Sequence, residues 1–221
     1  MTWLAAASVP ERAKFVDPTE GWAGRQGSEW TKPERNPADV EGLNRSYMAR
    51  FKTTRTEVNE WALEGVPRTA TVLEVGCSHG AQLNGMAAVG FTSLEGCDVN
   101  ADAIALCPWD AKLADGRSLP YPDSAFDVVM TSGTLMQIPP GSKAKFVAEC
   151  YRVSKRWVYG VEGASTLPCQ WLFGDLIPPA WTELYPERMM RPGWKIVRAR
   201  WLENNAAGQM MHLRAYLLER E

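Results

Sequence analysis

The chain has 221 residues, of which 45% are hydrophobic and 23% are charged, and its formal net charge is -2. This length and composition predict one globular domain, or one domain with a lid. The charge balance gives no electrostatic case for nucleic acid as a partner, although a local basic patch is compatible with it, and no apolar run approaches the ~18 residues of a membrane-spanning helix.

The N-terminal stretch MTWLAAASVPERAKF has no basic segment before its apolar residues. We therefore expect no secretory signal and a cytoplasmic location. The five cysteines are an odd number without a C-x-x-C pair, and only two histidines accompany them. Neither a disulfide framework nor a metal centre is expected, and the cysteines are interpreted as reduced thiols.

The first part of the chain predicts a helical cap. Residues 1–40 are rich in proline, glycine and charge, which indicates short helices separated by loops. Residues 44–63 carry apolar side chains at helical spacing, so one or two helices are expected there, ended by Gly65 and Pro67. Residues 1–66 are accordingly interpreted as an N-terminal cap or lid.

From residue 67 to residue 221 the pattern changes to that of an α/β core. Strand and helix patterns alternate, which predicts a Rossmann-like, doubly wound and mostly parallel sheet with helices on both faces. The expected strands are 71–76, 93–99, 111–116, 124–133 and 156–163, and the expected helices are 81–90, 101–109 and 142–154.

The last part of the chain interrupts and then closes this core. Residues 164–193 contain many prolines and tryptophans and are interpreted as an insertion over the ligand site, with a short helix near 179–185. Strand patterns at 194–203 and 210–220 are joined by a short polar connection. Such a pair predicts an antiparallel strand at one edge of the sheet.

The stretch VLEVGCSHG at residues 72–80 joins a buried strand to a loop almost free of large side chains. In a doubly wound sheet, ligands bind beyond the carboxyl ends of such strands. The loop has the spacing G-x-x-x-G, whereas a dinucleotide site requires G-x-G-x-x-G. Glu74 lies just before the loop. A carboxylate there suits a positively charged ligand and is unfavourable beside a pyrophosphate.

Two further acids follow the next two predicted strands. Asp98, in CDVN, is placed where a carboxylate accepts hydrogen bonds from both ribose hydroxyls. Asp115, in LADG, is placed to accept from an adenine amino group. The alternatives are that Glu74 is a solvated acid at a strand end and that Asp115 caps a turn with Gly116. Three acids at three successive strand ends favour an adenosine ligand with a cationic centre.

The order VLEVGCSHG, CDVN and LADGRSLPYPDSAFDVVMTSGTLMQI resembles class I S-adenosylmethionine-dependent methyltransferases over residues 70–160. Ser78 stands where that family often has glycine. The resemblance implies S-adenosylmethionine as the cofactor, with Asp98 on its ribose and Asp115 at its adenine. It also implies Glu74, Gly76, Cys77, Ser78, His79 and Gly80 beside the methionine part, Val99 and Gly116 beside the adenine, and Thr131 and Gln137 close to the cofactor.

A narrower likeness involves EGWAGRQGSEWTKPERN, TSGTLMQIPP and YRVSKRWVYGVE. These stretches are similar to methyltransferases associated with pseudaminic acid biosynthesis. The likeness implies a sugar or another small polar acceptor. It also implies that Trp22, Arg35 and Asn36 belong to a lid over the cofactor.

Glu162 is the candidate catalytic residue. It ends the predicted strand RWVYGVEG, where a carboxylate can act as a general base or orient an acceptor group. The alternative is a surface acid at a strand end. Tyr47 and Arg50 are candidates for binding the methyl acceptor, with packing in the core or lid as the alternative for Tyr47.

The expected function is methyl transfer from S-adenosylmethionine to a hydroxyl or amine of a small molecule, without a metal, a nucleic acid or a membrane as partner. One alternative is an NAD-dependent oxidoreductase, which the missing G-x-G-x-x-G disfavours. A second is a non-catalytic cofactor-binding scaffold, which the three acids disfavour. A third is a nucleic-acid methyltransferase, which the absence of an N-P-P-Y type loop disfavours. The acceptor, the methylated atom, the use of a base and the oligomeric state remain open.

Overall fold

The computed structural model describes residues 18–166, 168–171, 180–204 and 211–221. Four helices come first: α1 (Pro18–Ala23), α2 (Arg25–Trp30), α3 (Val40–Phe51) and α4 (Arg55–Ala62). Local capping defines the last two. The Asp39 side chain accepts from the backbone of Gly42 at the start of α3, and Thr54 and Glu57 form a capping box at the start of α4. The helices predicted within 44–63 are confirmed.

A seven-stranded sheet forms the centre of the molecule, in the order β3-β2-β1-β4-β5-β9-β8. Its strands are β1 (Thr71–Val75), β2 (Ser93–Asp98), β3 (Asp110–Leu113), β4 (Phe126–Ser132), β5 (Ser154–Ala164), β8 (Trp194–Leu202) and β9 (His212–Arg220). The strands β1 to β5 pair in parallel, and β9 is antiparallel to both β5 and β8. The predicted mostly parallel sheet with an antiparallel edge is confirmed.

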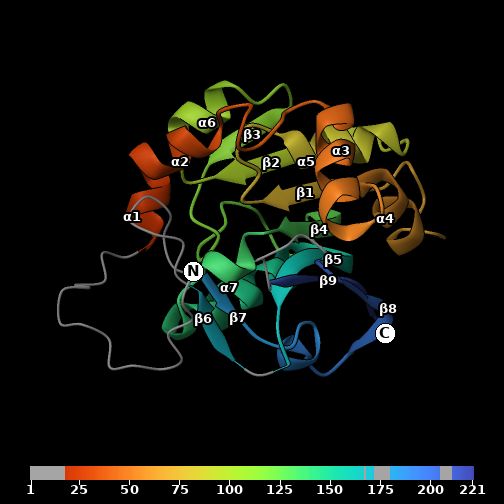
Figure 1. Cartoon of the computed structure of the whole chain (residues 1–221). Coiled ribbons are helices and arrows are strands. Elements are labelled where there is room, and N and C mark those ends of the chain that lie inside the picture. Colours follow the sequence, from red (N-terminus) through yellow and green to blue (C-terminus); the bar gives the residue numbers. More distant parts are fainter. Residues whose placement is uncertain (1–17, 167, 172–179, 205–210) are drawn as a thin grey trace.

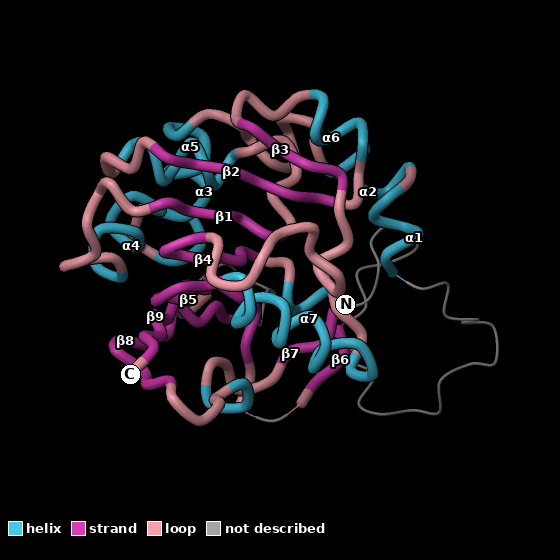
Figure 2. Tube along the Cα trace, turned by 180° about the vertical axis from the view of Figure 1, so that it is seen from behind, coloured by secondary structure: helices cyan, strands magenta, loops and turns pink. Residues whose placement is uncertain are grey.

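Helices cover both faces of this sheet (Figure 1, Figure 2). The connecting helices are α5 (Ala81–Ala88), α6 (Ala101–Ala105) and α7 (Pro140–Val153), with the short turn η1 (Leu135–Gln137) after β4. One apolar core lies between the sheet and α3, α4 and α5, and a second lies between the sheet and α7. Successive residues of a strand point to opposite faces, so Val72 and Leu73 enter different cores.

Strand order reverses between β1 and β4, because the chain runs outward from β1 through β2 to β3 and then returns to the other side. The carboxyl ends of β1 and β4 therefore border the crevice in which doubly wound sheets bind ligands. Figure 1 shows α1 and α2 at the side of the sheet toward which β1 and β2 point.

The short helix predicted near residues 179–185 is wrong. The structure has a strand there, β7 (Ala180–Thr182), which pairs antiparallel with β6 (Cys169–Trp171), and the turn η2 (Glu187–Met189) follows it. Backbone pairing with β6 satisfies the amides that a helix would have bonded internally. Trp181 and Thr182 are also residue types that favour extended backbone. The connection between β6 and β7, residues 172–179, lies outside the described residues.

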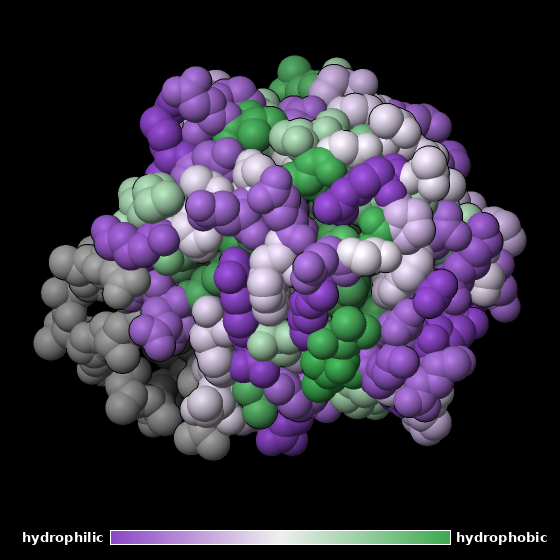
Figure 3. All heavy atoms as spheres, turned by 90° about the vertical axis from the view of Figure 1, so that its right-hand side faces the viewer, coloured by the Kyte–Doolittle hydropathy of each residue, from purple (hydrophilic) through white to green (hydrophobic). Residues whose placement is uncertain are grey.

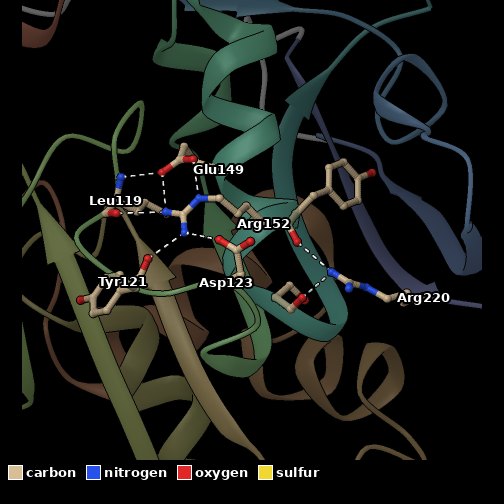
Figure 4. Close-up of polar contacts among 8 residues, drawn as sticks. Leu119, Tyr121, Asp123, Glu149, Arg152 and Arg220 are labelled. Carbon is tan, nitrogen blue, oxygen red and sulfur yellow. Dashed lines mark hydrogen bonds and ion pairs between the residues drawn. The ribbon is translucent and has the colours of Figure 1, made fainter.

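Arg152, near the end of α7, holds the connection between β3 and β4 against the helix (Figure 4). Its guanidinium donates to the backbone carbonyls of Tyr121 and Leu119 at 2.8 and 3.1 Å and pairs with Asp123 and Glu149. Glu149 in turn accepts from the Leu119 amide at 2.7 Å. The stretch LPYPDSAF thus owes its shape to a planar cation with several donors.

The surface on the side of α4 and β8 is mainly hydrophilic, with apolar patches between the polar side chains (Figure 3). Ile196 and Val197 of β8 are among the exposed large hydrophobic residues of the described chain, at 38% and 41% exposure. Scattered apolar surface of this kind is usual for globular proteins. No helix within the described ranges has the length and apolar character needed to cross a membrane.

Candidate functional site

The loop after β1 is a tight turn stabilised by backbone hydrogen bonds. The amides of Gly76 and Cys77 both donate to the Cys97 carbonyl, at 2.8 and 3.0 Å. Gly76 and Gly80 have φ angles of 81° and 84°, and Ser78 has 50°. Such left-handed backbone favours glycine, so Ser78 adopts the conformation for which the resembled family often uses glycine. Gly80 then serves as the N-cap of α5.

Gly76 is expected to tolerate no side chain. A Cβ atom there would lie 2.4 Å from Thr134 Oγ1, whereas Gly65, with a φ of 83°, has open space around it. Gly65→Ala is expected to cost about 1 kcal/mol for the backbone angle alone. Gly76→Ala is expected to cost about 2 kcal/mol more from the steric contact. Free energies of unfolding in urea measure both, and equal losses would contradict the proposed contact.

Glu74 is a buried carboxylate with one oxygen that lacks a hydrogen-bond donor among the described residues. Its side chain is 1% exposed, and its Oε2 atom has no partner among the described residues. It lies on the face of β1 that meets α4 and α5, one residue from the strand's end. Burial raises the pKa of Glu74 well above its ordinary value, and Arg55 acts in the opposite direction. A donor or a cation is therefore the partner that this carboxylate lacks.

Asp98 connects the end of β2 to the loop. Its Oδ2 atom accepts from the Ser78 amide at 2.8 Å, and its Oδ1 atom accepts from the Asn100 amide at 2.9 Å. Burial raises the pKa of Asp98, and the amides of Asn100 and Ser78 oppose the rise. Each carboxylate oxygen has a second lone pair. The side chain can therefore still accept from a ligand's hydroxyl groups.

Asp115 and Gly116 follow β3 in a turn. Both carboxylate oxygens of Asp115 accept from the Arg117 guanidinium, at 2.9 and 3.0 Å for its Nε atom, and Oδ1 also accepts from the Arg117 amide at 2.8 Å. A Cβ at Gly116 would lie 2.3 Å from the Phe146 ring, so the backbone packs directly on the core. These contacts agree with the turn-capping alternative for Asp115. Val99 is half-buried between Asp98 and Asn100.

Glu162 binds the loop that follows β4. Its side chain is fully buried, and its two oxygens accept from the amides of Thr134 at 3.2 Å and Met136 at 3.3 Å. Burial raises the pKa of Glu162, while the Thr131 hydroxyl and the loop's backbone amides favour the charged form. Thr131 is therefore buried, and its side chain lies on the same face of the sheet as Glu162. Gln137, at the end of η1, has a buried Oε1 atom without a partner in the described chain.

The cap lies against the loop, α5 and the segment after β2, and three of its backbone carbonyls contact side chains there. The Asn100 side chain donates to the carbonyl of Trp22 at 2.9 Å. The ring of His79 is bonded through Nε2 to the carbonyl of Asn36 at 3.0 Å. The Asn84 side chain donates to the carbonyl of Ala38 at 2.8 Å. The stretch that sequence analysis placed in a lid thus borders the loop.

The candidate acceptor residues lie on α3, and both are already engaged. Tyr47 is buried, and its hydroxyl accepts from Arg55 Nη1 at 2.8 Å. The Arg50 guanidinium folds back on its own helix, donating to the Ser46 carbonyl at 3.2 Å and to the Ser46 hydroxyl at 2.8 Å. Packing in the cap thus accounts for the contacts of Tyr47.

Sequence analysis missed two residues of this region. Asn100 caps α6, accepting from the Ala103 amide at 2.8 Å, while it holds α1. An asparagine directly before a helical pattern is a known N-cap signal and was available in CDVN. Arg55 is fully buried beside the site. No sequence pattern marks it, because arginines in the first turn of a helix are usually solvated.

The residues present fit a nucleoside ligand with a cationic end. Among the described residues, six buried side-chain atoms without partners belong to segments around the carboxyl ends of β1, β2 and β4. They are Trp22 Nε1, Arg55 Nη2, Glu74 Oε2, His79 Nδ1, Gln82 Oε1 and Gln137 Oε1. Buried polar groups normally have partners, so such a group of atoms indicates a polar ligand or water. Within the described ranges, no cluster of three or more His, Cys, Asp or Glu could hold a metal ion.

Comparison with known proteins agrees with this site. The family model described as a methyltransferase domain matches residues 73–157, which include Glu74, the glycine loop and Asp98. An uncharacterized protein of Haemophilus influenzae is 27% identical over 131 residues, 51% of this chain and 52% of that protein. The chain thus spans about half the length of this curated relative.

Two solved structures are similar over nearly the whole chain. Magnesium protoporphyrin IX methyltransferase from Synechocystis PCC 6803, with bound SAM, has a TM-score of 0.65 at 14% identity, covering 95% of this chain and 99% of that one. A 1,6-didemethyltoxoflavin-N1-methyltransferase from Burkholderia thailandensis, with bound 1,6-didemethyltoxoflavin and S-adenosylhomocysteine, has a TM-score of 0.65 at 12% identity, covering 99% and 93%. At these identities the likeness shows the fold.

Proposed function

We propose that this chain, a class I S-adenosylmethionine-dependent methyltransferase by its domain and fold, transfers the methyl group of the cofactor to a hydroxyl or amine of a small molecule. The observation that carries the proposal is Glu74, a buried carboxylate whose Oε2 atom has no donor among the described residues, within the matched domain and just before the glycine loop. The small-molecule class is supported by the absence of excess basic charge.

S-adenosylmethionine supplies an electrophilic methyl group on a positively charged sulfur, so the protein's part is mainly positioning and the exclusion of water. Glu74 offers negative charge to the cationic end, and Asp98 offers acceptor oxygens to the ribose. The segment around Asn36 covers the loop. β7, in the described part of the insertion at 164–193, packs against η1 and so reaches the same region. We infer that this insertion borders the acceptor pocket.

Glu162 is better suited to positioning than to proton abstraction. A general base must reach the proton that it removes, whereas this carboxylate is fully buried and bound by backbone amides. We propose that it fixes residues 134–136 beside the reacting groups. The narrower likeness noted in the sequence supports a sugar or another small polar acceptor, for which Tyr47 and Arg50 remain candidate neighbours.

Cofactor binding is tested most directly by thermal denaturation. S-adenosylmethionine or S-adenosylhomocysteine at a hundredfold excess over its Kd is expected to stabilise the protein by about 2.7 kcal/mol, since ligands that bind only the folded state shift the equilibrium. For a chain of this size the melting temperature should rise by about 5 to 10 °C. NAD at the same concentration is the control and should leave it unchanged.

A rise with NAD alone would favour the oxidoreductase alternative, and no rise with either ligand would contradict the proposal. Once binding is established, formation of S-adenosylhomocysteine is measured with small hydroxyl and amine acceptors, beginning with sugars. Product formed only with amines would narrow the acceptor class. Binding without turnover on any acceptor would favour the scaffold alternative.

A further inference from the structure

Arg55, in the first turn of α4, is a charged side chain without any contact with water. It is fully buried, and an arginine stays protonated in proteins. Its guanidinium donates to Tyr47 Oη at 2.8 Å, Asn59 Oδ1 at 3.0 Å and Ser132 Oγ at 3.1 Å. All three acceptors are neutral, so hydrogen bonding alone leaves a whole positive charge in the core.

Glu74 carries the charge that complements it. The guanidinium reaches the end of β4 at Ser132, two residues past Met130, which is the register partner of Glu74 in β1, so Ser132 and Glu74 lie on the same face of the sheet. Arg55 favours the charged form of this carboxylate. No hydrogen bond or ion pair joins them within the described chain, and each has one terminal atom without a partner, Nη2 and Oε2. Arg55 therefore favours the charged form of Glu74 without direct contact, against the burial that raises the pKa of this carboxyl.

The other charged or titratable groups acting on Glu74 all oppose its ionisation. They are Asp98 from the end of β2, Glu162 from β5 and Cys107 from the segment after α6. Burial opposes it as well. Arg55 is the cation among the groups that act on this carboxylate, and it comes from the N-terminal cap rather than from the matched domain at residues 73–157.

We propose that Arg55 is a positioning residue for the cofactor, whose buried guanidinium stabilises the charged carboxylate of Glu74 and so links the N-terminal cap to the site. The inference rests on the proposed function, because it assigns Glu74 to the cationic end of S-adenosylmethionine. It also implies that the matched domain at residues 73–157 needs Arg55 of the cap to form a complete cofactor site. The side chain of Asn59, which accepts from Arg55 and from the Tyr159 hydroxyl at 2.6 Å, fixes the guanidinium in place.

The test compares Arg55→Met, Glu74→Gln and the double variant with the wild-type full chain. Arg68→Met is the matched control, since Arg68 precedes β1 and packs over Phe91 instead. The Kd of S-adenosylmethionine is measured by calorimetry from pH 6.0 to 7.5, where the ligand's amino group stays largely protonated. Removing Arg55 favours protonation of Glu74, so Arg55→Met should raise Kd roughly tenfold at pH 7. This loss should shrink as the pH rises.

The double variant gives the decisive comparison. Glu74→Gln should weaken binding at every pH, and the double variant should bind no worse than Glu74→Gln, because Arg55 acts through Glu74. The proposal would be overturned if the losses of binding free energy in the two single variants added up in the double variant. It would also be overturned by a folded Arg55→Met protein with the wild-type Kd and pH profile. Arg68→Met should match the wild type in both.

Melting temperatures keep the test informative where a single variant folds poorly. Removing one member of a buried charge pair leaves the other uncompensated, whereas removing both does not. The double variant is therefore expected to melt above Arg55→Met, and a double variant that melts at the sum of the two losses would overturn the coupling. If the wild-type protein binds no S-adenosylmethionine, the proposed function fails, while this comparison still reports whether the two charges are coupled.

Discussion

Asp98→Ala is expected to raise the Kd of S-adenosylmethionine roughly a hundredfold. The substitution removes a carboxylate that we assign to the ribose hydroxyls, and hydrogen bonds to charged groups contribute about 1.5 to 3 kcal/mol each. It also frees the amide of Ser78, which donates to Asp98 Oδ2 at 2.8 Å. The loop should therefore lose part of its shape together with its ligand.

Calorimetry with S-adenosylmethionine and S-adenosylhomocysteine measures this effect. Asp110→Ala is the matched control, because Asp110 is exposed and lies at the amino-terminal end of β3, whereas Asp98 lies at the carboxyl end of the neighbouring strand β2. The control should bind as the wild type does. An unchanged Kd in a folded Asp98→Ala protein would remove Asp98 from the ribose.

Glu162→Gln is expected to lower stability by about 3 kcal/mol and to depress turnover, with little change in cofactor affinity. The amide group of glutamine presents donors where the backbone of residues 134–136 requires an acceptor, so at least one buried amide is left without a partner. The melting temperature should fall by about 6 to 12 °C.

Denaturation and initial-rate measurements on one preparation separate these effects. Glu60→Gln, an exposed residue of α4, is the control and should change stability by less than about 0.5 kcal/mol. A role as general base predicts a different result, in which Glu162→Gln abolishes turnover and leaves stability unchanged. That outcome would contradict the positioning role.

Sequence patterns predicted the sheet because strand and helix periodicities are local. The alternation from β1 to β5 and the closing pair β8 and β9 follow from the spacing of apolar residues and turn residues. The region around β7 could not be predicted in the same way. Ala180–Thr182 is a strand because it pairs with Cys169–Trp171, and this partner is not visible in its own sequence.

The residues of the site also differ in how far the sequence predicts them. The glycine loop, Glu74 and Asp98 follow strands directly, so topology alone brings them to one edge. The partners of the side chains depend on tertiary packing. Neither the capture of Glu162 by backbone amides nor the burial of Arg55 has a local sequence signal, because each depends on an element distant in the chain.

The contacts of Arg152 show that the motifs of the family resemblance are of two kinds, one that shapes the scaffold and one that offers contacts to a ligand. LPYPDSAF, part of the third stretch that carries the resemblance, is held to α7 by Arg152 through the carbonyls of Leu119 and Tyr121 and the carboxylate of Asp123. These contacts serve the packing of the connection on α7 whether or not a ligand is bound. Inheritance of this stretch therefore traces ancestry of the scaffold, whereas inheritance of Glu74 and Asp98 is the better guide to retained chemistry.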